Sequence, residues 1–587
     1  MKLRPIITII LSLLFLVAWY TIMGYIGWLP DEAGEEPAQE QTRQTSREPS
    51  EDDAGVTAPP AQANGSPTKP ETTEALDQPA ETKIDFPPGD SQPLAQADLR
   101  EKPTSTVQVT VPEYVNAVLA TDSGGVVEVT LQQFFTYDRE SRVSLGSYRF
   151  PYCSLVSRTG QISLDTGIME KHSDGHVTLT RTAASLPLVV TEHWRFDSEQ
   201  PYSLQYSVQF VNEGDEELVL EDLAVLVGGL TEERRGEKTS KLGRAGSVSL
   251  AAELMVPETN RPESIAAGKV EDMEAQELQK IARQQSEWVA LHNKYFVFYL
   301  AANGTPFQGC RLGTYEEDLA NVGDDVSEML TAQWLYGRAH LSAVTVMPGK
   351  TSTLEFEGYA GPKEYKRLRA ISKDLPSIMR LDLFMFFRAG WMGAISTTIL
   401  KSLTWIKGAI GQEWGYGVAI ILITIVIKLL FWPLTHKSTV SMRRMQKLQP
   451  LIKEIREKYK DDAQKMNRKM MELYREHKVN PLGGCLPILF QIPVFFALFN
   501  TLRGAIELRQ APFLWVHDLS LPDTLAWMPM GIPIRPLAIL MGGTMFLQMK
   551  LSPSTGDPSQ KRMMTFMTVF FMFIFFEKSF NPLIKFL

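Results

Sequence analysis

Residues 421–450 read ILITIVIKLLFWPLTHKSTVSMRRMQKLQP, an apolar run that continues directly into a basic, polar segment. An apolar helix that ends beside clustered Lys and Arg is typical of a membrane span entering the cytoplasm. Lys428 lies inside the apolar run, where a charge facing lipid would cost roughly 2.5 to 3.5 kcal/mol. Two readings stay open: the side chain snorkels to the interface near Trp432, or it faces a hydrated cavity.

The composition indicates a chain built from unlike parts. Of its 587 residues, 44% are hydrophobic and 22% charged, which is too polar for a wholly membrane-embedded protein. The formal net charge of −9 gives no support for nucleic-acid recognition. Cys153, Cys310 and Cys485 are too widely spaced for a zinc site, and a disulfide between Cys153 and Cys310 is left open. We expect no metal and no cofactor.

Three regions precede the membrane core. Residues 1–30 place Lys2 and Arg4 before an apolar stretch long enough to cross a bilayer, which predicts a retained signal-anchor helix. Residues 31–105 are rich in Pro, Glu, Gln, Thr and Ser and predict a disordered linker. Residues 106–368 contain runs of β-forming residues between turns and predict a large β-sandwich domain with a helical insertion at 271–286.

The charge of one segment determines the expected topology. Residues 435–480 hold thirteen Lys and Arg against six Asp and Glu and predict a cytoplasmic helical hairpin with a DDAQ turn, although such a hairpin could serve topology alone. An even number of spans should separate it from a cytoplasmic N-terminus, and the single span before the β-domain places that domain on the outer side of the membrane. Residues 383–411 predict an interfacial amphipathic helix. Residues 412–587 form the expected core, with spans at about 414–432, 482–505, 527–549 and 563–576.

Several ordered motifs of this core resemble one protein family. They are QPLIKEIREKYKDDAQKMNRKMMELYREHKVNPLGGCLPILFQIPVFFALF at 449–499, ELRQAPFLWVHDLS at 507–520, GGTMFLQMKLSP at 542–553 and DPSQKRMMTFM at 557–567. Together they resemble the membrane protein insertases of the YidC/Oxa/Alb family. The upstream anchor, linker and β-domain, which ends in GYAGPKEY at 358–365, resemble the Gram-negative form of that family. This resemblance implies that the β-domain lies in the periplasm.

The resemblance implies a polytopic α-helical membrane protein whose core encloses a hydrophilic groove open to the cytoplasm and to lipid. It implies a non-enzymatic insertase that helps nascent membrane proteins insert, fold and assemble in the inner membrane. Nascent membrane proteins and the lipid bilayer are the implied partners, with the SecYEG translocon and the ribosome as further candidates. Where the family continues with a Pro-Ser-Gly-Leu turn and a final span, residues 575–587 read FFEKSFNPLIKFL, which resembles a truncated or frame-shifted end.

The resemblance also implies site residues. The family carries a cationic groove residue five positions before the Pro that ends the second span, and counting back from Pro433 selects Lys428. Most members have Arg there; Lys keeps the charge but loses the forked donor geometry. The resemblance also implies Thr424, and the apolar slide for a substrate helix comprises Ile492, Phe495 and Phe571. Gln491 and Asn500 are added to the groove because they are polar residues within an apolar span. Ordinary helix packing is the alternative for the slide residues, and no catalytic residue is expected.

Two other classes of function compete with this reading. A secondary transporter or channel would use Lys428 in its solute or proton path, but the sequence shows no internal repeat. A membrane-anchored sugar-binding or sugar-processing protein would use the β-domain, which contains no convincing nucleophile, carboxylate pair or metal cluster. The motifs therefore favour the insertase.

Overall fold

The computed structural model describes residues 102–551, apart from internal gaps of which the longest are 233–249, 319–330 and 480–485, and beyond these only residues 565, 566 and 569. All of them belong to one compact unit, Asp85–Leu587. The predicted anchor, nearly all of the predicted linker, Phe571 and most of the predicted span at 563–576 lie outside the described residues.

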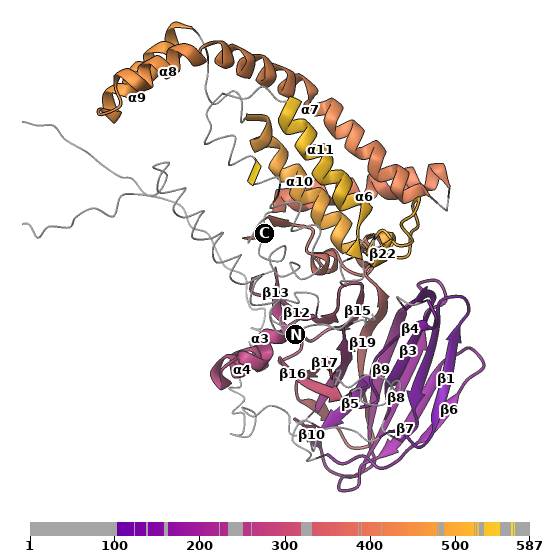
Figure 1. Cartoon of the computed structure of the whole chain (residues 1–587). Helices are drawn as coiled ribbons and strands as arrows, with labels where there is room; N and C mark the ends of the chain where they lie inside the picture. The colour runs from indigo at the N-terminus through magenta and orange to yellow at the C-terminus, as the bar shows by residue number, and fades with distance from the viewer. Residues whose placement is uncertain are drawn as a thin grey trace, which may run out of the picture. The chain divides into compact units, whose positions relative to one another are not determined.

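Two large antiparallel sheets make up the β-domain (Figure 1). The first has the order β1-β2-β3-β5-β11-β17-β16, with β4 beside β3: β1 (Thr106–Val111), β2 (Val115–Ala120), β3 (Val126–Phe135), β4 (Arg142–Leu145), β5 (Tyr152–Ser157), β11 (Leu223–Thr231), β16 (Gly309–Asp318) and β17 (Thr331–His340). The second has the order β13-β12-β14-β15-β19-β9-β8-β7-β6: β6 (Ile168–Lys171), β7 (Val177–Thr182), β8 (Leu188–Phe196), β9 (Ser203–Asn212), β12 (Ala251–Val256), β13 (Arg261–Ala266), β14 (Trp288–His292), β15 (Phe296–Ala302) and β19 (Thr351–Pro362).

Shorter elements complete this part of the chain. Strands β10 (Leu218–Leu220) and β18 (Val344–Val346) form a small separate sheet. Helices α3 (Ala267–Asp272) and α4 (Ala275–Ala282) lie between β13 and β14 in the sequence, where the helical insertion was predicted. After β19 the chain continues through α5 (Tyr365–Ile371), η3 (Leu375–Met379), β20 (Leu383–Phe384) and β21 (Phe387–Arg388) into the helical part.

The core of the β-domain lies between the two sheets. Strand β9 shows why: its apolar residues at alternate positions are buried, as expected for a strand with one face against a core. Tyr152 on β5 donates its hydroxyl to the carbonyl of Tyr299 on β15, and its ring stacks on Phe298 at 4.7 Å between centroids. Trp194 on β8 donates Nε1–H to the carbonyl of Cys153 at 2.8 Å. These contacts join the first sheet to the second.

The structure decides whether Cys153 and Cys310 form a disulfide, which the sequence left open. Both are buried in this core and both are free, so they do not form a disulfide. Burial raises the pKa of both thiols, that of Cys310 to about 12. The two cysteines therefore act as small apolar core residues.

A buried group of charged side chains lies where the β-domain meets the following chain. His292 Nε2 is 3.7 Å from Glu253 Oε1, and Arg380 Nε is 3.6 Å from the same oxygen. The Lys363 ammonium lies 3.3 Å from His292 Nδ1 and donates to the carbonyl of Asn293 at 3.0 Å. Burial, reinforced by repulsion from Lys363, lowers the pKa of His292 to about 4. Burial also lowers the pKa of Lys363 to about 7.

We predict that the protein loses stability as the pH falls from about 6.5 towards 4. Between these pH values the unfolded chain binds a proton at His292 and the folded state does not. The free energy of unfolding therefore decreases as the pH falls. The effect is on the order of 3 kcal/mol when complete. Glu507, whose pKa burial raises to about 7, acts in the opposite direction as the pH falls below 7. The measurement is therefore the difference between the wild type and His292→Gln in thermal midpoint at pH 7.5, 6 and 5; identical pH profiles would contradict the prediction.

Three helices pack together in the helical part: α6 (Gly390–Ile410), α7 (Gly415–Lys447) and α10 (Leu486–Gly504). Their shared apolar core is formed by Met392, Ile399, Leu403, Ala419, Ile423 and Ala497. Small and hydroxyl residues allow α6 and α10 to approach closely. Ser396 Oγ donates to the carbonyl of Ala497 at 3.4 Å, and Thr501 Oγ1 donates to the carbonyl of Ser396 at 3.2 Å. Within the described residues one helix, α7, is long and apolar enough to cross a membrane, and Pro536–Gln548 is a shorter apolar helix.

Three predicted boundaries differ from the structure. The helix predicted at 383–411 begins only at Gly390, because Leu383–Phe384 and Phe387–Arg388 pair as the short strands β20 and β21. Helix α7 does not end at Trp432 but continues through Pro433 to Lys447, so the start of the predicted hairpin at 435–480 belongs to it. The hairpin consists of α8 (Gln449–Lys458) and α9 (Ala463–Glu476), and Asp462 of the DDAQ motif caps α9 by accepting from the Lys465 amide at 2.9 Å. Helix α11 (Pro536–Leu551) begins after the paired strands β22 (Ala526–Trp527) and β23 (Pro533–Ile534), not at Trp527, because Pro is favoured at the first position of a helix.

Candidate functional site

Helix α7 carries Lys428 and Thr424 on one side, because residues four apart in an α-helix are neighbours. Ala419 and Ile423 are buried against the neighbouring helices, which turns Lys428 away from the packed face. Lys428 is exposed, whereas Thr424 is half-buried and donates Oγ1–H to the carbonyl of Ile421 at 2.7 Å. The other exposed side chains around Lys428 are apolar: Ile425, Val426, Leu429, Leu430 and Trp432. A cation among them requires a nearby interface or water.

Helix α10 does not bring its two predicted groove residues together. Gln491 and Asn500 are separated by about two and a half turns at 3.6 residues per turn, so they project from opposite sides of the helix. Both are half-buried. Gln491 instead shares its side with Phe495, whose exposed ring stacks on Phe499 at 6.2 Å. Ile492 is also exposed, so Gln491 lies next to the predicted slide rather than to Asn500.

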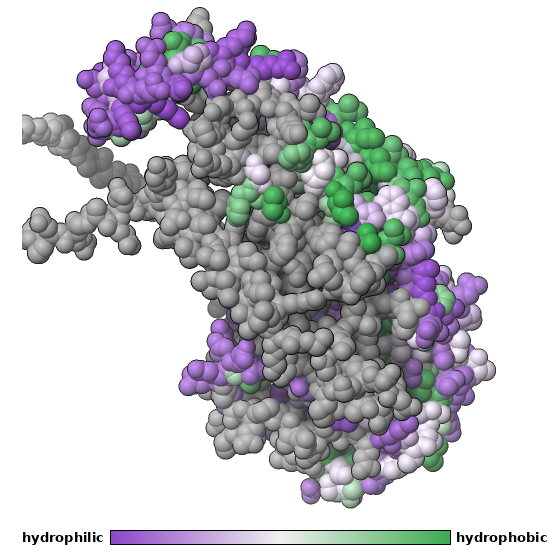
Figure 2. Space-filling model, in the orientation of Figure 1, coloured by the Kyte–Doolittle hydropathy of each residue, from purple (hydrophilic) through white to green (hydrophobic). Residues whose placement is uncertain are grey.

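The hairpin helices α8 and α9 form a strongly hydrophilic surface, whereas hydrophobic side chains gather over α7 (Figure 2). The Lys458 and Lys465 ammonium groups lie 6.0 and 5.5 Å from the centre of the Tyr459 ring. Exposed ion pairs such as Lys469 with Glu472, at 2.6 Å, neutralise part of this charge and add little stability. The basic surface of this region extends from the end of α7 through the hairpin, because residues 435–480 hold thirteen Lys and Arg against six Asp and Glu.

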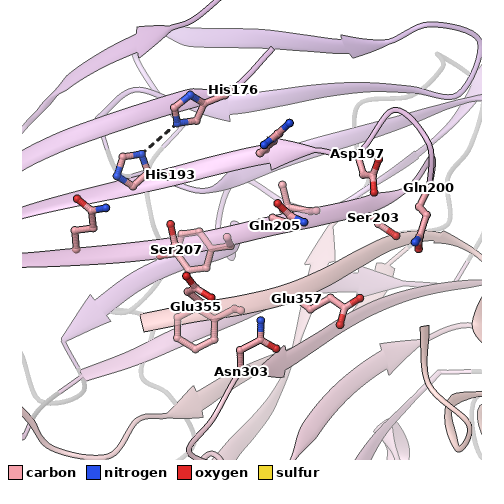
Figure 3. A pocket seen from close by; sticks show the side chains of 15 residues that line it. His176, His193, Asp197, Gln200, Ser203, Gln205, Ser207, Asn303, Glu355 and Glu357 are labelled. Carbon is pink, nitrogen blue, oxygen red and sulfur yellow. Dashed lines mark hydrogen bonds between the residues drawn. The ribbon is translucent and has the colours of Figure 1, made fainter. Parts of the chain in front are cut away.

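A second candidate site is a groove of about 570 Å3 on the face of the second sheet that points away from the core (Figure 3). Most of its polar side chains come from β8, β9 and β19, because the strand register places His193 beside Ser207 and Ser207 beside Glu355. His176 Nε2 and His193 Nδ1 are 3.2 Å apart, and the two rings stack at 5.4 Å between centroids. Partial burial, followed by repulsion from His176, lowers the pKa of His193. Burial raises the pKa of Glu357 at the other side of the groove.

This groove offers hydrogen-bond donors and acceptors for a small polar ligand. Among the residues that the structure describes, no group of three or more His, Cys, Asp or Glu side chains is arranged to hold a metal ion. Sequence analysis missed the groove because Gln205, Ser207 and Gln209 alternate with buried residues and are typical of any exposed strand face. A weak signal was available in three of the eight histidines, since His172 and His176 fall in the turn between β6 and β7 and His193 falls on β8.

Known families and proteins match most of the described elements. Residues 106–390 match the family model of the YidC periplasmic domain, and residues 405–580 match that of the 60Kd inner membrane protein. A membrane protein insertase YidC of Pelobacter propionicus is 42% identical over 315 residues, which are 53% of this chain and 53% of that protein. The same-named protein of Geobacter sp. (strain M21) is 37% identical over 355 residues, 57% of this chain and 60% of its own. That of Syntrophobacter fumaroxidans is 35% identical over 393 residues, 65% of each chain.

The matched segments thus span between about half and two thirds of the length of these relatives. Among solved structures, a galactose mutarotase related enzyme from Lactobacillus acidophilus aligns with 44% of this chain and 97% of its own at 8% identity, with a TM-score of 0.29 that is too low to support an argument.

The two family matches confirm the predicted fold class. The first contains the strands of the β-domain, which is therefore a periplasmic β-sandwich, and the second contains α7 to α11 of a polytopic helical membrane protein of the inner membrane. Both models and all three relatives point to one family, and the chain belongs to the YidC/Oxa/Alb family.

Proposed function

We propose that this protein is a membrane protein insertase, which lowers the barrier for a nascent helix to enter the inner membrane and for its short polar tail to cross. The observation that carries the proposal is Lys428, which is exposed beside Thr424 on a helix whose other exposed residues there are apolar. An ammonium group in such surroundings attracts an acidic residue of a client more strongly than it would in bulk water. Binding and release of the client involve no covalent step, so the proposed function is not enzymatic.

The proposed groove contains Lys428 and Thr424 on α7 and Gln491 on α10. Asn500 lies on the opposite side of α10 from Gln491, so it does not share one side of the proposed groove with Gln491. Ile492 and Phe495, both exposed, suit an apolar slide along which the substrate helix leaves, and Phe571 is the third slide residue proposed. Their exposure supports a role beyond packing within the described helices.

The proposed topology places the N-terminus and the hairpin in the cytoplasm. The basic surface of α8 and α9 supports this assignment, because positively charged loops remain on the cytoplasmic side. Nascent membrane proteins and the lipid bilayer are the proposed partners, and the ribosome and the SecYEG translocon are further candidates for contact with the chain. No direct recognition of nucleic acid is part of the proposal.

The test uses the purified full chain, reconstituted alone in liposomes. A small phage-coat-like client with an acidic tail should insert, as measured by protection of its tail from added protease, and liposomes without the protein serve as the control. Preparations in which the client stays fully accessible would contradict the proposal. Uptake of a solute or of protons by the same liposomes, without insertion, would favour a transporter in which Lys428 lies in the path.

A further inference from the structure

The groove on the outer face of the second sheet is built from rows of facing polar side chains (Figure 3). The strand register forms two such rows across β8, β9 and β19: His193, Ser207 and Glu355 in one, and Arg195, Gln205 and Glu357 in the next. Neighbouring strands lie about 4.8 Å apart, and the two rows lie about 7 Å apart because alternate residues of a strand share a face. The groove therefore presents polar groups at regular intervals in two directions.

The side chains at the centre of this groove are available to a ligand. No hydrogen bond or ion pair joins the side chain of Gln205, Ser207 or Glu355 to another residue in the part of the chain that the structure describes. The exposed face of β3 and β4 differs, because Ser144 there donates Oγ–H to Glu128 Oε1 at 2.8 Å. The polar groups of the groove can therefore bond to water or to a bound molecule without breaking contacts within the protein.

The groove does not suit an apolar ligand or an extended peptide. Its apolar lining residues, Leu204, Tyr206 and Phe356, are 0%, 1% and 3% exposed, so they offer almost no apolar surface. Strands β8, β9 and β19 are each paired with a neighbouring strand on both sides. No strand edge in the groove is therefore open to the backbone of a peptide.

The charges of the groove disfavour an anionic ligand. Its lining has one guanidinium group, that of Arg195, and three carboxyl groups, which belong to Asp197, Glu355 and Glu357. His193 adds no positive charge at neutral pH, because partial burial lowers its pKa. A phosphate or a carboxylate would therefore meet a net negative charge and be repelled.

A neutral ligand with many hydroxyl groups meets all these conditions. Each hydroxyl group donates and accepts a hydrogen bond, and the Ser207 hydroxyl, the Gln205 amide and the neutral His193 ring do the same, whereas carboxylates accept. We propose that the outer face of β8, β9 and β19 binds a neutral saccharide that reaches the periplasm. This is a further function of the β-domain, and it does not depend on the insertase function proposed above.

The test titrates the full chain in lipid nanodiscs with two neutral trisaccharides, maltotriose and N-acetylated chitotriose, and with anionic trigalacturonate. Binding is measured by isothermal titration calorimetry and by saturation-transfer NMR. At least one neutral trisaccharide should bind saturably, and trigalacturonate should not bind. Ser207→Leu should weaken the binding by about tenfold or more, because it removes a hydroxyl group and fills the middle of the groove. Gln205→Ala, which removes an exposed amide, should weaken it several-fold.

The matched control is Thr180→Leu, on the exposed face of β7 outside the groove, which should leave saccharide binding unchanged. Amide exchange in β8 and β9 should be the same in every variant; if Ser207→Leu destabilises these strands, Gln205→Ala decides. Failure of both neutral trisaccharides to bind, or binding that neither groove variant weakens, would overturn the proposal. Binding of trigalacturonate alone would also overturn it. No client is present in these measurements, so their failure would leave the insertase proposal unaffected.

Discussion

Lys428→Glu should lower the insertion of a client with an acidic tail by about tenfold or more, at matched amounts of protein. The substitution replaces an attraction between unlike charges by a repulsion, in surroundings that are less polar than water because the exposed neighbours on α7 are Leu429, Leu430 and Val426. A client with a neutral tail should lose much less. The measurement is the initial rate of tail protection in liposomes, with both clients tested against both proteins.

Three further variants separate the charge from its alternatives. Lys428→Arg should retain insertion, because the charge is kept and the forked geometry of Arg is not required for a single attraction. Lys428→Ala should give an intermediate loss. Lys437→Glu, an exposed position farther along α7, changes the net charge by the same amount and should leave the acidic-tailed client nearly unaffected. Equal insertion of that client by the wild type and Lys428→Glu would leave Lys428 as a residue that only reaches for the interface.

The extent of α7 shows what could be predicted from the sequence and what could not. The apolar run from Trp414 to Trp432 predicted a membrane-spanning helix, and helix α7 covers nearly all of it. Its end was placed at Trp432, where the apolar run closes with an aromatic residue before the polar and basic segment. In the structure the helix continues past Pro433 to Lys447. Pro433 removes only one backbone donor, and Thr435 donates Oγ1–H to the Phe431 carbonyl at 2.9 Å within the same helix. The hydropathy pattern therefore predicted the apolar segment of α7 but not how far the helix extends beyond it.

The candidate site was predictable as a set of residue types but not as an arrangement. Motif spacing selected Lys428 and Thr424, and helical periodicity alone places them on one side of α7. The same periodicity separates Gln491 from Asn500, although both were assigned to one groove from their polarity. The hydrogen bonds between the turn that follows β3 and the segment that follows α10 could not be predicted from the sequence, because Arg139 and Gln510 are 371 positions apart. Only the folded chain brings such segments together.

The largest loss of stability is expected from Arg181→Met, because it leaves a buried carboxylate without its partner. Arg181 on β7 and Glu192 on β8 form an ion pair in the core of the β-domain, with side chains 5% and 0% exposed. Glu192 Oε1 also accepts from the hydroxyl of Tyr206, at 2.6 Å, and from the amide of Leu155 on the opposite sheet, at 3.1 Å. Removing one member of a buried pair typically costs about 3 to 5 kcal/mol, since the remaining charge keeps its desolvation penalty without the attraction.

The measurement is amide exchange in β7, β8 and β9 of the full chain, where protection should fall by roughly a hundredfold to a thousandfold. Arg195→Met serves as the matched control, because it removes the same charge from the exposed face of β8 and should cost less than about 1 kcal/mol. The double variant Arg181→Met with Glu192→Gln should recover most of the loss: the neutral amide oxygen still accepts from Tyr206 and Leu155, and no isolated charge remains in the core. If the double variant were as unstable as Arg181→Met alone, the loss would come from the packing of the Arg181 side chain rather than from the stranded carboxylate.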